Sequence, residues 1–582
     1  MARREQGLSE PLRALCRAVA DRYAGSLDDV LRLAAPSREV GTEEPFPAPP
    51  PSPAAPTPAT WGRYPNGPAF LEALARGDCP RAVWTALPGP HWPCELAAAV
   101  TATLASGRGA LVVLPDRRSV ARVDAALGTL VGAGRHVVLT ADCGPEERDR
   151  RWQAVSRGSV RAVIGTRTAM FAPVADLGLV AIWDDGNASH SENRAPYPHA
   201  REVLLLRAVH ETTACLVGDV GQTAEAAQLL ATGWARPLAA DRAMVRAAAP
   251  LVRTVDDADQ GLDAAARLPT QAWRTARTAL ERGPVLVQVP RRGYVPRLAC
   301  EQCRAPARCR HCSGPLEARR ARDALCCGWC GKTTPDWTCA ECGSPRLWAR
   351  AVGTRRTAEE LGRAFSGVPV RTSSRDHIIA SIPDRPALVV STPGAEPFVE
   401  GGGGYAATLL LDGWALLGRP DLRAGEMALR RWLGAAALVR DRAAGGTVMV
   451  IADPAARPVQ ALVRWDPSGF AQHELAERAE LGFPPVSRMA TVEGPGHDVM
   501  SFLWDTAQLP PSAVVLGMVP LPAADPGRPG GEGEPASGEE WMRALVRVPH
   551  GQGAALAAAL KAARTAGKGQ QVRVQIDPLE LA

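Results

Sequence analysis

The sequence predicts an α/β protein with two parallel-sheet lobes in tandem. Short apolar runs alternate with helix-length stretches from about residue 80, and this pattern is typical of buried parallel strands covered by helices. A second series of such runs begins at residue 284, and a cysteine-rich insert interrupts it. The chain has 582 residues, which is too long for one hydrophobic core, so several domains are expected.

The N-terminal region is predicted to hold two short helices followed by a linker. Residues 8–36 carry apolar side chains at helical spacing. Residues 45–58 read PFPAPPPSPAAPTP, a stretch too rich in proline to pack. We therefore assign residues 1–40 to a helical N-terminal region and residues 41–60 to an extended linker.

The two lobes and the C-terminal region follow from the apolar runs. The first lobe is predicted over residues 61–280, with strands at 110–115, 136–140, 161–165, 177–183 and 214–218 and helices that include 118–131 and 198–209. The second lobe is predicted over 281–299 and 343–472, with strands at 284–290, 387–392, 407–412 and 447–453. Residues 473–582 are expected to form a small α+β domain, with strands near 543–548 and 571–576.

Charge and composition limit the classes of function. The net charge is +6, which permits nucleic-acid binding without demonstrating it. No apolar run approaches the length of a membrane span, and the charged N-terminus lacks the apolar segment of a signal peptide. We expect a cytoplasmic protein without a membrane partner, whose 14 cysteines are metal ligands or buried thiols.

The predicted insert, residues 300–342, holds nine of the 14 cysteines. Eight of them form four Cys-x-x-Cys pairs, which are Cys300/Cys303, Cys309/Cys312, Cys327/Cys330 and Cys339/Cys342. Each pair can place two thiolates on one zinc ion at about 2.3 Å. Eight ligands fill two tetrahedral sites, so the sequence predicts two structural zinc ions, with Cys326 as a spare thiol.

The pairing of these motifs has two solutions. A hairpin-length spacer separates the inner pairs, 309/312 and 327/330, and predicts one ribbon with its own zinc. Folding that ribbon brings 300/303 and 339/342 together as the other zinc site. Sequential pairing along the chain is the alternative.

A Gly-Lys-Thr triplet at residues 331–333 follows one of the pairs, but it does not form a phosphate-binding loop. Such a loop needs a glycine five positions before Gly331 and a helix afterwards. The sequence has Cys326 at that position, and Pro335 follows within four residues. The triplet is interpreted as the turn that leaves a zinc knuckle.

Taken with the stretches VIGTRTAMFAPVADLGLVAIWDD (163–185), ELAERAELGFPPVSRMA (474–490) and VQIDPLE (574–580), this organisation resembles the PriA-type primosomal protein N′ family of replication-restart helicases. RRGYVPRLACEQC (291–303) resembles the family's entry into its zinc insert. The resemblance implies two RecA-like helicase lobes, a double zinc ribbon inside the second, and a C-terminal domain. Residues 16–36 resemble the end of the family's N-terminal DNA-binding region, most of which is expected to be missing.

The chain departs from the family at the positions that bind ATP. The P-loop position reads TALPGPHWPCELAAAV (85–100), where prolines remove backbone donors; His91 would be a poor substitute for the missing lysine. The family's Asp-Glu-Glu-His motif reads Trp183-Asp184-Asp185-Gly186, and its Gly-Arg-Ala-Gly-Arg motif, which supplies arginine fingers, reads ALVRD at 437–441. Because several parts of the phosphoryl-transfer site are replaced together, we predict no ATP hydrolysis and assign no catalytic residue.

The resemblance and these departures lead to three hypotheses of function. The first is a nucleoid-associated replication-restart protein that binds forked or single-stranded DNA and recruits primosome proteins without unwinding, with the single-stranded-DNA-binding protein and the replicative helicase loader as implied partners. The alternatives are an active ATP-dependent 3′-5′ helicase with a non-standard nucleotide site, and a protein-interaction scaffold without DNA binding. Nucleotide binding without hydrolysis stays open.

Arginines in and beside the insert are the candidate DNA contacts. Arg291, Arg292 and Tyr294 combine positive charge with a ring that can stack on bases. Arg308 and Arg310 lie among the paired cysteines and could contact phosphates. A structural role for the first group and a solvated basic hairpin for the second are the competing interpretations.

Overall fold

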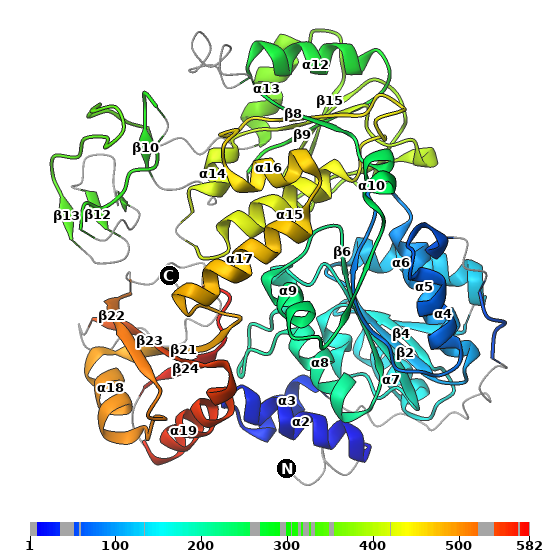
Figure 1. Cartoon of the computed structure of the whole chain (residues 1–582), viewed down its shortest axis with the longest axis vertical. Helices are drawn as coiled ribbons and strands as arrows, with labels where there is room; N and C mark the ends of the chain where they lie inside the picture. The colour runs from blue at the N-terminus through cyan, green and yellow to red at the C-terminus, as the bar shows by residue number, and fades with distance from the viewer. Residues whose placement is uncertain are drawn as a thin grey trace. The chain divides into compact units, whose positions relative to one another are not determined.

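The computed structural model describes residues 8–34, 52–56, 60–132, 134–255, 268–290, 298–303, 305–311, 316–317, 325–327, 332–348, 354–419, 421–521, 540–567 and 571–580. They belong to two compact units (Figure 1). The first unit comprises Met1–Ala86, His91–Asp241 and Leu475–Leu579, and the second comprises Leu87–Pro90, Arg242–Glu474 and Glu580–Ala582.

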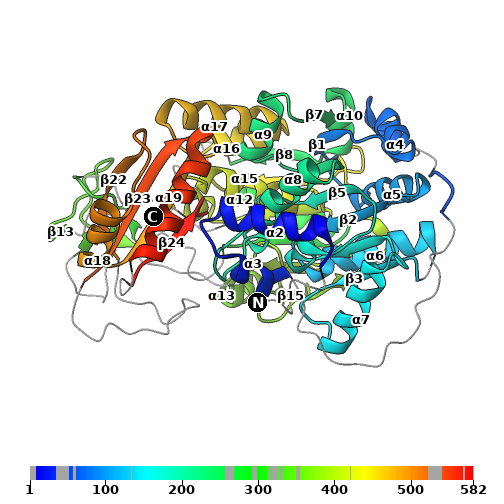
Figure 2. The ribbon, with the colours of Figure 1, turned by 90° about the horizontal axis from the view of Figure 1, so that it is seen from below.

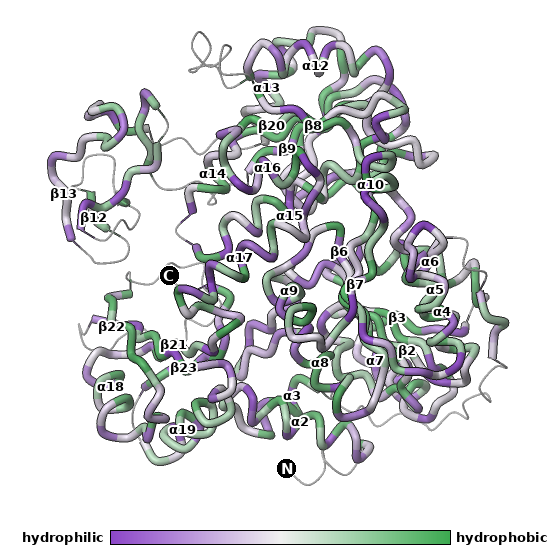
Figure 3. Tube along the Cα trace, in the orientation of Figure 1, coloured by the Kyte–Doolittle hydropathy of each residue, from purple (hydrophilic) through white to green (hydrophobic). Residues whose placement is uncertain are grey.

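A seven-stranded sheet forms the centre of the first unit, in the order β3-β4-β2-β5-β6-β1-β7 with every pairing parallel. Its strands are β1 (Arg81–Thr85), β2 (Gly109–Val113), β3 (His136–Leu139), β4 (Ala162–Gly165), β5 (Leu177–Trp183), β6 (Ala214–Asp219) and β7 (Arg236–Ala239). The helices are α4 (Gly67–Ala75), α5 (Trp92–Ala105), α6 (Arg117–Val131), α7 (Pro145–Ser156), α8 (Ala200–His210) and α9 (Ala224–Ala231). Strands β2, β4, β5 and β6 are buried along their whole length, which explains their continuous apolar sequences (Figure 3).

The N-terminal helices and the C-terminal domain share one hydrophobic core with this sheet. Helix α2 (Glu10–Arg22) buries Leu12, Leu15, Cys16 and Val19, whose spacing places them on one helix face. It is followed by α3 (Leu27–Ala34). Figure 2 shows α2 beside α8 and the C-terminal helix α19 (Gly553–Ala566).

The C-terminal domain is an antiparallel sheet in the order β22-β23-β21-β24. Its strands are β21 (Ser487–Pro495), β22 (Val514–Pro520), β23 (Trp541–Pro549) and β24 (Arg573–Ile576), and α18 (Gly496–Met500) accompanies α19. The α+β class expected for this region is therefore present.

The second unit contains a six-stranded parallel sheet in the order β15-β17-β9-β19-β20-β8. Its strands are β8 (Leu251–Thr254), β9 (Val285–Gln288), β15 (Val370–Ser373), β17 (Leu388–Ser391), β19 (Ala407–Leu410) and β20 (Thr447–Val450). The helices of this part of the chain are α10 (Arg242–Ala248), α12 (Thr270–Leu280), α13 (Thr354–Ala364), α14 (Gly413–Leu417), α15 (Ala424–Ala436), α16 (Arg457–Arg464) and α17 (Pro467–Leu481). Two parallel sheets in tandem confirm the predicted fold class.

The lobe boundary predicted at residue 280 lies too far along the chain. Strand β8 pairs with β20 of the second sheet, and α12 packs in the hydrophobic core of that sheet. The apolar pattern does not indicate β8 because its sequence, LVRT, includes Arg253 and only one of its residues is buried. Among the helices of the described residues, none is long and apolar enough to cross a membrane.

The cysteine-rich insert consists of very short strands. β10 (Ala299–Cys300) pairs with β14 (Leu347–Trp348), and β11 (Leu316–Glu317), β12 (Leu325–Cys327) and β13 (Thr333–Thr334) form a second small sheet. Among the described residues of the insert, the buried cluster contains Leu298, Cys300, Ala307, Cys309, Leu316, Leu325, Cys327, Trp337 and Cys339. Small clusters of this kind are commonly stabilised by a further constraint such as a metal ion.

Candidate functional site

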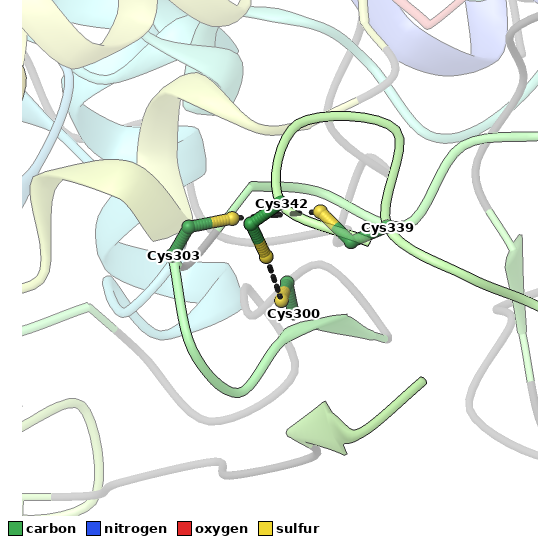
Figure 4. Close-up of side chains that lie close together, drawn as sticks. All are labelled: Cys300, Cys303, Cys339 and Cys342. Carbon is green, nitrogen blue, oxygen red and sulfur yellow. Dashed lines mark hydrogen bonds between the residues drawn. The ribbon is translucent and has the colours of Figure 1, made fainter. Parts of the chain in front are cut away.

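Four cysteines of the insert converge on one point (Figure 4). The sulfur atoms of Cys300, Cys303, Cys339 and Cys342 all lie within 4.8 Å of one another. Cys300 Sγ lies 3.5 Å from Cys342 Sγ, and Cys303 Sγ lies 3.4 Å from Cys339 Sγ. The structure therefore joins the first Cys-x-x-Cys pair to the last. This is the pairing in which the inner ribbon folds and brings the two outer pairs together.

The backbone around this cluster explains how each pair presents two sulfurs. The N–H of Cys300 donates to the carbonyl of Ala305 at 2.8 Å, and the N–H of Cys339 donates to the carbonyl of Ser344 at 3.0 Å. Both turns therefore close between residues i and i+5. The first cysteine of each pair is buried and the second is exposed, so the sulfurs approach one point from two sides.

The donor set of the cluster fits a structural zinc ion. A tetrahedral zinc with bonds of about 2.3 Å holds its sulfurs roughly 3.8 Å apart, close to the separations found here. Against the effect of burial, hydrogen bonds from the backbone amides of Cys303 and Gln302 lower the pKa of the Cys300 thiol, whereas burial and the neighbouring thiols raise the pKa of Cys303. A metal ion would bind the thiolate form of each ligand.

The second predicted zinc set is only partly covered by the described residues. Cys309 and Cys327 are both buried in the core of the insert, whereas Cys312 and Cys330 lie outside the described residues. The N–H of Cys327 donates to the carbonyl of Lys332 at 2.9 Å. That bond closes the same i to i+5 turn that occurs at Cys300 and Cys339.

The candidate DNA contacts are also only partly described. Arg308 is half-buried, whereas Arg310 is exposed and donates from Nη2 to Thr338 Oγ1 at 2.7 Å. Arg291, Arg292 and Tyr294 lie outside the described residues. The structure thus gives a surface position for one of the five candidates.

The second region of interest is the carboxyl edge of the first sheet, where ligands of open α/β sheets bind. Strand β1 ends at Thr85 and leads to α5, and the resemblance predicts the P-loop position in this connection. Strand β5 ends at Trp183, immediately before Asp184 and Asp185. Strand β6 lies between β5 and β1 in the sheet, so the ends of all three strands meet at one edge.

Tryptophan rings fill this edge. Trp92, the first residue of α5, stacks on Trp183 with ring centroids 4.3 Å apart and an angle of 7° between the planes. Trp183 also contacts Trp84 of β1 at 5.3 Å, and Trp84 contacts Trp61 at 5.0 Å. All four rings are buried. We call Trp61, Trp84, Trp92 and Trp183 the tryptophan cluster.

A buried carboxyl group of α5 lies next to the tryptophan cluster. Glu95 is fully buried, and its oxygens lie 3.2 Å from Arg63 Nη2 and 3.4 Å from the Tyr64 hydroxyl. Its backbone carbonyl accepts a hydrogen bond from Trp61 Nε1 at 2.9 Å. Burial raises the pKa of Glu95 to about 7, against the lowering effect of Arg63. Through these contacts, Trp61, Arg63 and Tyr64 are held against the first turn of α5.

The two aspartates of the acidic motif are engaged within the protein. Asp184 adopts a left-handed backbone with φ of 57°, and its Oδ2 accepts from Asn187 Nδ2 at 2.8 Å. Asp185 is buried, and its Oδ2 accepts from Arg201 Nη1 at 3.0 Å and from Thr223 Oγ1 at 2.8 Å. Burial raises the pKa of Asp185, while Arg201 and Thr223 act in the opposite direction.

In the second unit, Arg440 lies within residues 437–441, where the resemblance predicts the arginine-finger motif. Its Nη2 lies 2.7 Å from Asp384 Oδ1, and its Nε and Nη1 donate to the carbonyls of Gly403, Gly404 and Arg282. Tyr405, which bonds the backbone of Arg440, precedes β19. Arg440 is therefore held at the amino edge of the second sheet, opposite the edge where ligands of such sheets bind.

Sequence reasoning missed the tryptophan cluster as a unit. The sequence places Trp183 beside the acidic pair, but it does not by itself relate Trp183 to Trp61, Trp84 and Trp92. The signal depends on recognising β1, because Trp84 and Trp183 then stand near the ends of two strands of one sheet, and the carboxyl ends of parallel strands share one edge. Two large rings at that edge indicate a packed site.

The family model and the curated relatives agree on one family. Residues 479–579 match the family model described as the primosomal protein N C-terminal domain. The "Probable replication restart protein PriA" of Mycobacterium tuberculosis is 49% identical over 597 residues, covering 99% of this chain and 90% of the relative, and that of Mycobacterium leprae is 50% identical with the same coverage. Among solved structures, RecG bound to a three-way DNA junction aligns at 10% identity and a TM-score of 0.37, covering 69% of this chain and 47% of RecG. Because relatives of nearly 50% identity align over almost their whole length, the chain belongs to the PriA replication restart protein family.

Proposed function

We propose that this protein acts in replication restart by binding forked or single-stranded DNA and recruiting primosome proteins, without hydrolysing ATP. The name of its mycobacterial relatives supports the restart role. The stacking of Trp92 on Trp183 carries the claim of inactivity. In a motor of this family the corresponding positions would hold the phosphate-binding loop and the magnesium-binding aspartate.

Physical chemistry explains why this edge is unsuited to phosphate. A P-loop binds phosphate through consecutive backbone N–H groups and a lysine. Here Pro88, Pro90 and Pro93 contribute no N–H, and the chain's three lysines lie far along the sequence at 332, 561 and 568. Indole rings packed at 4.3 Å form an apolar contact, and inserting a multiply charged phosphate there would carry a large desolvation cost.

The acidic and arginine positions support the same proposal. The carboxylate of Asp185 is already bonded by Arg201 and Thr223, and Arg440 is bonded at the amino edge of its own sheet. Asp185 and Arg440 therefore contact other groups of the protein. In a motor of this family, the side chains at these positions would contact nucleotide. Catalysis of phosphoryl transfer depends mainly on such preplaced charges.

For the insert, we propose two structural zinc ions. The four-cysteine cluster would bind one through Cys300, Cys303, Cys339 and Cys342. The turn closed by the Cys327 N–H supports a second site with Cys309, Cys312, Cys327 and Cys330, because it repeats the turn at both pairs of the first site. Closed sites of four thiolates leave no open position, so the zinc would be structural.

ATP turnover tests the inactivity directly. Zinc-replete protein with saturating fork DNA should turn over radiolabelled ATP at least about 10³-fold more slowly than the roughly 10 s⁻¹ typical of enzymes, because no group is placed to stabilise the transferred phosphoryl group. Binding of the fork is measured in the same sample, so that an unfolded preparation is recognised. Turnover that disappears on Asp184→Asn would instead establish the active-helicase alternative.

DNA binding is tested through its dependence on salt. The affinity for single-stranded DNA should fall as salt rises, because arginine contacts release counterions from phosphates. Arg310→Ala should lower the slope of log affinity against log salt by about 0.7. Arg346→Ala is the matched control, since Arg346 lies on the same insert and pairs with Glu301 at 3.7 Å. If no DNA binds even at low salt, the protein-interaction scaffold replaces this proposal.

A further inference from the structure

We propose that Asp185 is one end of a chain of ion pairs that runs from the buried edge of the first sheet to the part-buried end of the N-terminal helix α2 and holds that helix in place. The chain consists of Asp185, Arg201, Glu202 and Arg22, and we call it the Asp185–Arg22 chain. It links the carboxyl edge of the first sheet to the last residue of α2. The inference concerns the architecture of the first unit, so it does not depend on whether ATP is hydrolysed.

The first link joins β5 to α8. Asp185 follows β5 directly, and its Oδ2 lies 3.0 Å from Arg201 Nη1. The side chains of Asp185 and Arg201 are only 1% and 8% exposed. A second carboxylate, that of Glu225, approaches Arg201 Nη2 at 3.8 Å. Because these side chains are buried, their charges interact in a medium of low dielectric constant. Each charge is then stabilised mainly by its partners rather than by water.

The next links reach α2. Arg201 Nε donates to Glu202 Oε1 at 3.1 Å, and Glu202 Oε2 accepts from Arg22 Nη2. Glu202 is therefore held between two arginines, one on its own helix and one on α2. The neighbouring residue adds a further connection, because the backbone N–H of His199 donates to the Tyr23 hydroxyl at 3.1 Å.

The charges of the chain are balanced. Burial raises the pKa of Glu202, but Arg22, Arg201 and Arg488 lower it to about 2. Arg488 belongs to β21 of the C-terminal domain and pairs with Asp577 at 2.6 Å. Removing one member of such a set leaves its neighbours buried without compensation, which costs more than the pair itself contributes.

A consequence for α2 follows from this arrangement. The helix has only 13 residues, and isolated helices of that length are marginal in water, so it depends on tertiary contacts. Its apolar face packs in the shared core, and its C-terminal end is held by Arg22 and Tyr23. A change at Asp185 should therefore loosen α2, three ion-pair links away.

Hydrogen exchange of the full-length protein tests the coupling. Asp185→Asn leaves Arg201 with a neutral partner, and the amides of residues 10–22 should then exchange about tenfold faster than in the wild type. Thr223→Val is the matched control. It removes the other hydrogen bond to Asp185, together with the N-cap of α9, but it leaves the path from Asp185 to Arg22 intact. It should loosen α9 while leaving α2 unchanged.

A variant at the opposite end keeps the test decisive if Asp185→Asn folds poorly. Arg22→Gln removes the charge from α2, and linkage requires the effect to run in both directions. The amides around Asp185 and Thr223 should then exchange faster. Equal protection of α2 in the Asp185→Asn and Thr223→Val proteins, or an unchanged sheet edge in Arg22→Gln, would overturn the proposal.

Discussion

Replacing Cys339 with serine should remove one zinc ion and unfold the cysteine-rich insert, the largest effect we expect from any single substitution. Cys339 is buried and lies 3.4 Å from Cys303. Structural zinc contributes about 10 kcal/mol or more to folding in small metal-bound units, and serine is a far weaker ligand than a thiolate. Within the described part of the insert, one small apolar cluster is present to replace that contribution.

The zinc content of matched variants separates the two predicted sites. Elemental analysis should give two zinc ions for the wild type and one for Cys339→Ser. Cys327→Ser should also give one, with the first site retained. Cys94→Ser is the control, because Cys94 is exposed on α5, outside the insert, and this variant should keep both ions.

Proteolysis reports on the fold of the insert in the same samples. Cleavage between residues 298 and 348 should become at least about tenfold faster in Cys339→Ser, because the local unfolding that exposes the chain is no longer opposed by the metal. A wild type that carries one zinc, or a Cys327→Ser protein that loses none, would contradict the second site. A wild type without zinc would contradict both.

The strands that are buried on both faces could be predicted from the sequence. The strands expected at 110–115, 161–165 and 177–183 correspond to β2, β4 and β5, which are buried on both faces and therefore carry continuous apolar runs. Strand β1 was missed, although it lies between β6 and β7 in the same sheet. Its sequence RAVWT has five residues with polar ends, so its assignment depends on neighbouring strands that the local sequence does not reveal.

The candidate site likewise has a part that could be predicted from the sequence and a part that could not. Spacing of two residues between cysteines is local and has a specific chemical meaning, so all four members of the cluster could be named from the sequence. The tryptophan cluster and the Asp185–Arg22 chain combine side chains from distant segments, such as Trp61 with Trp84 or Arg22 with Glu202. The sequence shows which residues are present, whereas their contacts depend on how α2 and α5 pack.

Substituting Trp183 with aspartate introduces the residue that the resemblance to the family's acidic motif implies for this position, yet we expect it to destabilise the first unit severely. Trp183 is 6% exposed and contacts Trp84 and Trp92. Removing a buried tryptophan leaves a cavity that costs about 3–5 kcal/mol, and a carboxyl group placed in that cavity adds a desolvation cost. The total should exceed roughly 4 kcal/mol.

The neighbouring strand shows how closely this edge is packed. A Cβ atom on Gly218 would lie 2.6 Å from the ring of Trp84 and 3.3 Å from that of Trp183. The rings thus occupy the space above β6 that any side chain at position 218 would need. Because the rings pack closely at this edge, a carboxylate at position 183 would be surrounded by aromatic rings rather than by groups placed to bind it.

Calorimetry and ATP turnover of two variants decide between a packed edge and a dormant motor. The first unit has more than 300 residues, and its entropy of unfolding scales with that size, so 4 kcal/mol lowers the melting temperature by about 6 °C. Trp183→Phe should lose much less, because phenylalanine keeps an aromatic ring in the stack. On the proposal of an inactive protein, neither variant should hydrolyse ATP, since an acid at position 183 would supply only one part of a phosphoryl-transfer site. A Trp183→Asp protein that melts with the wild type and gains ATP turnover would show that the edge can still accommodate a nucleotide, and the proposal of an inactive restart protein would then fail.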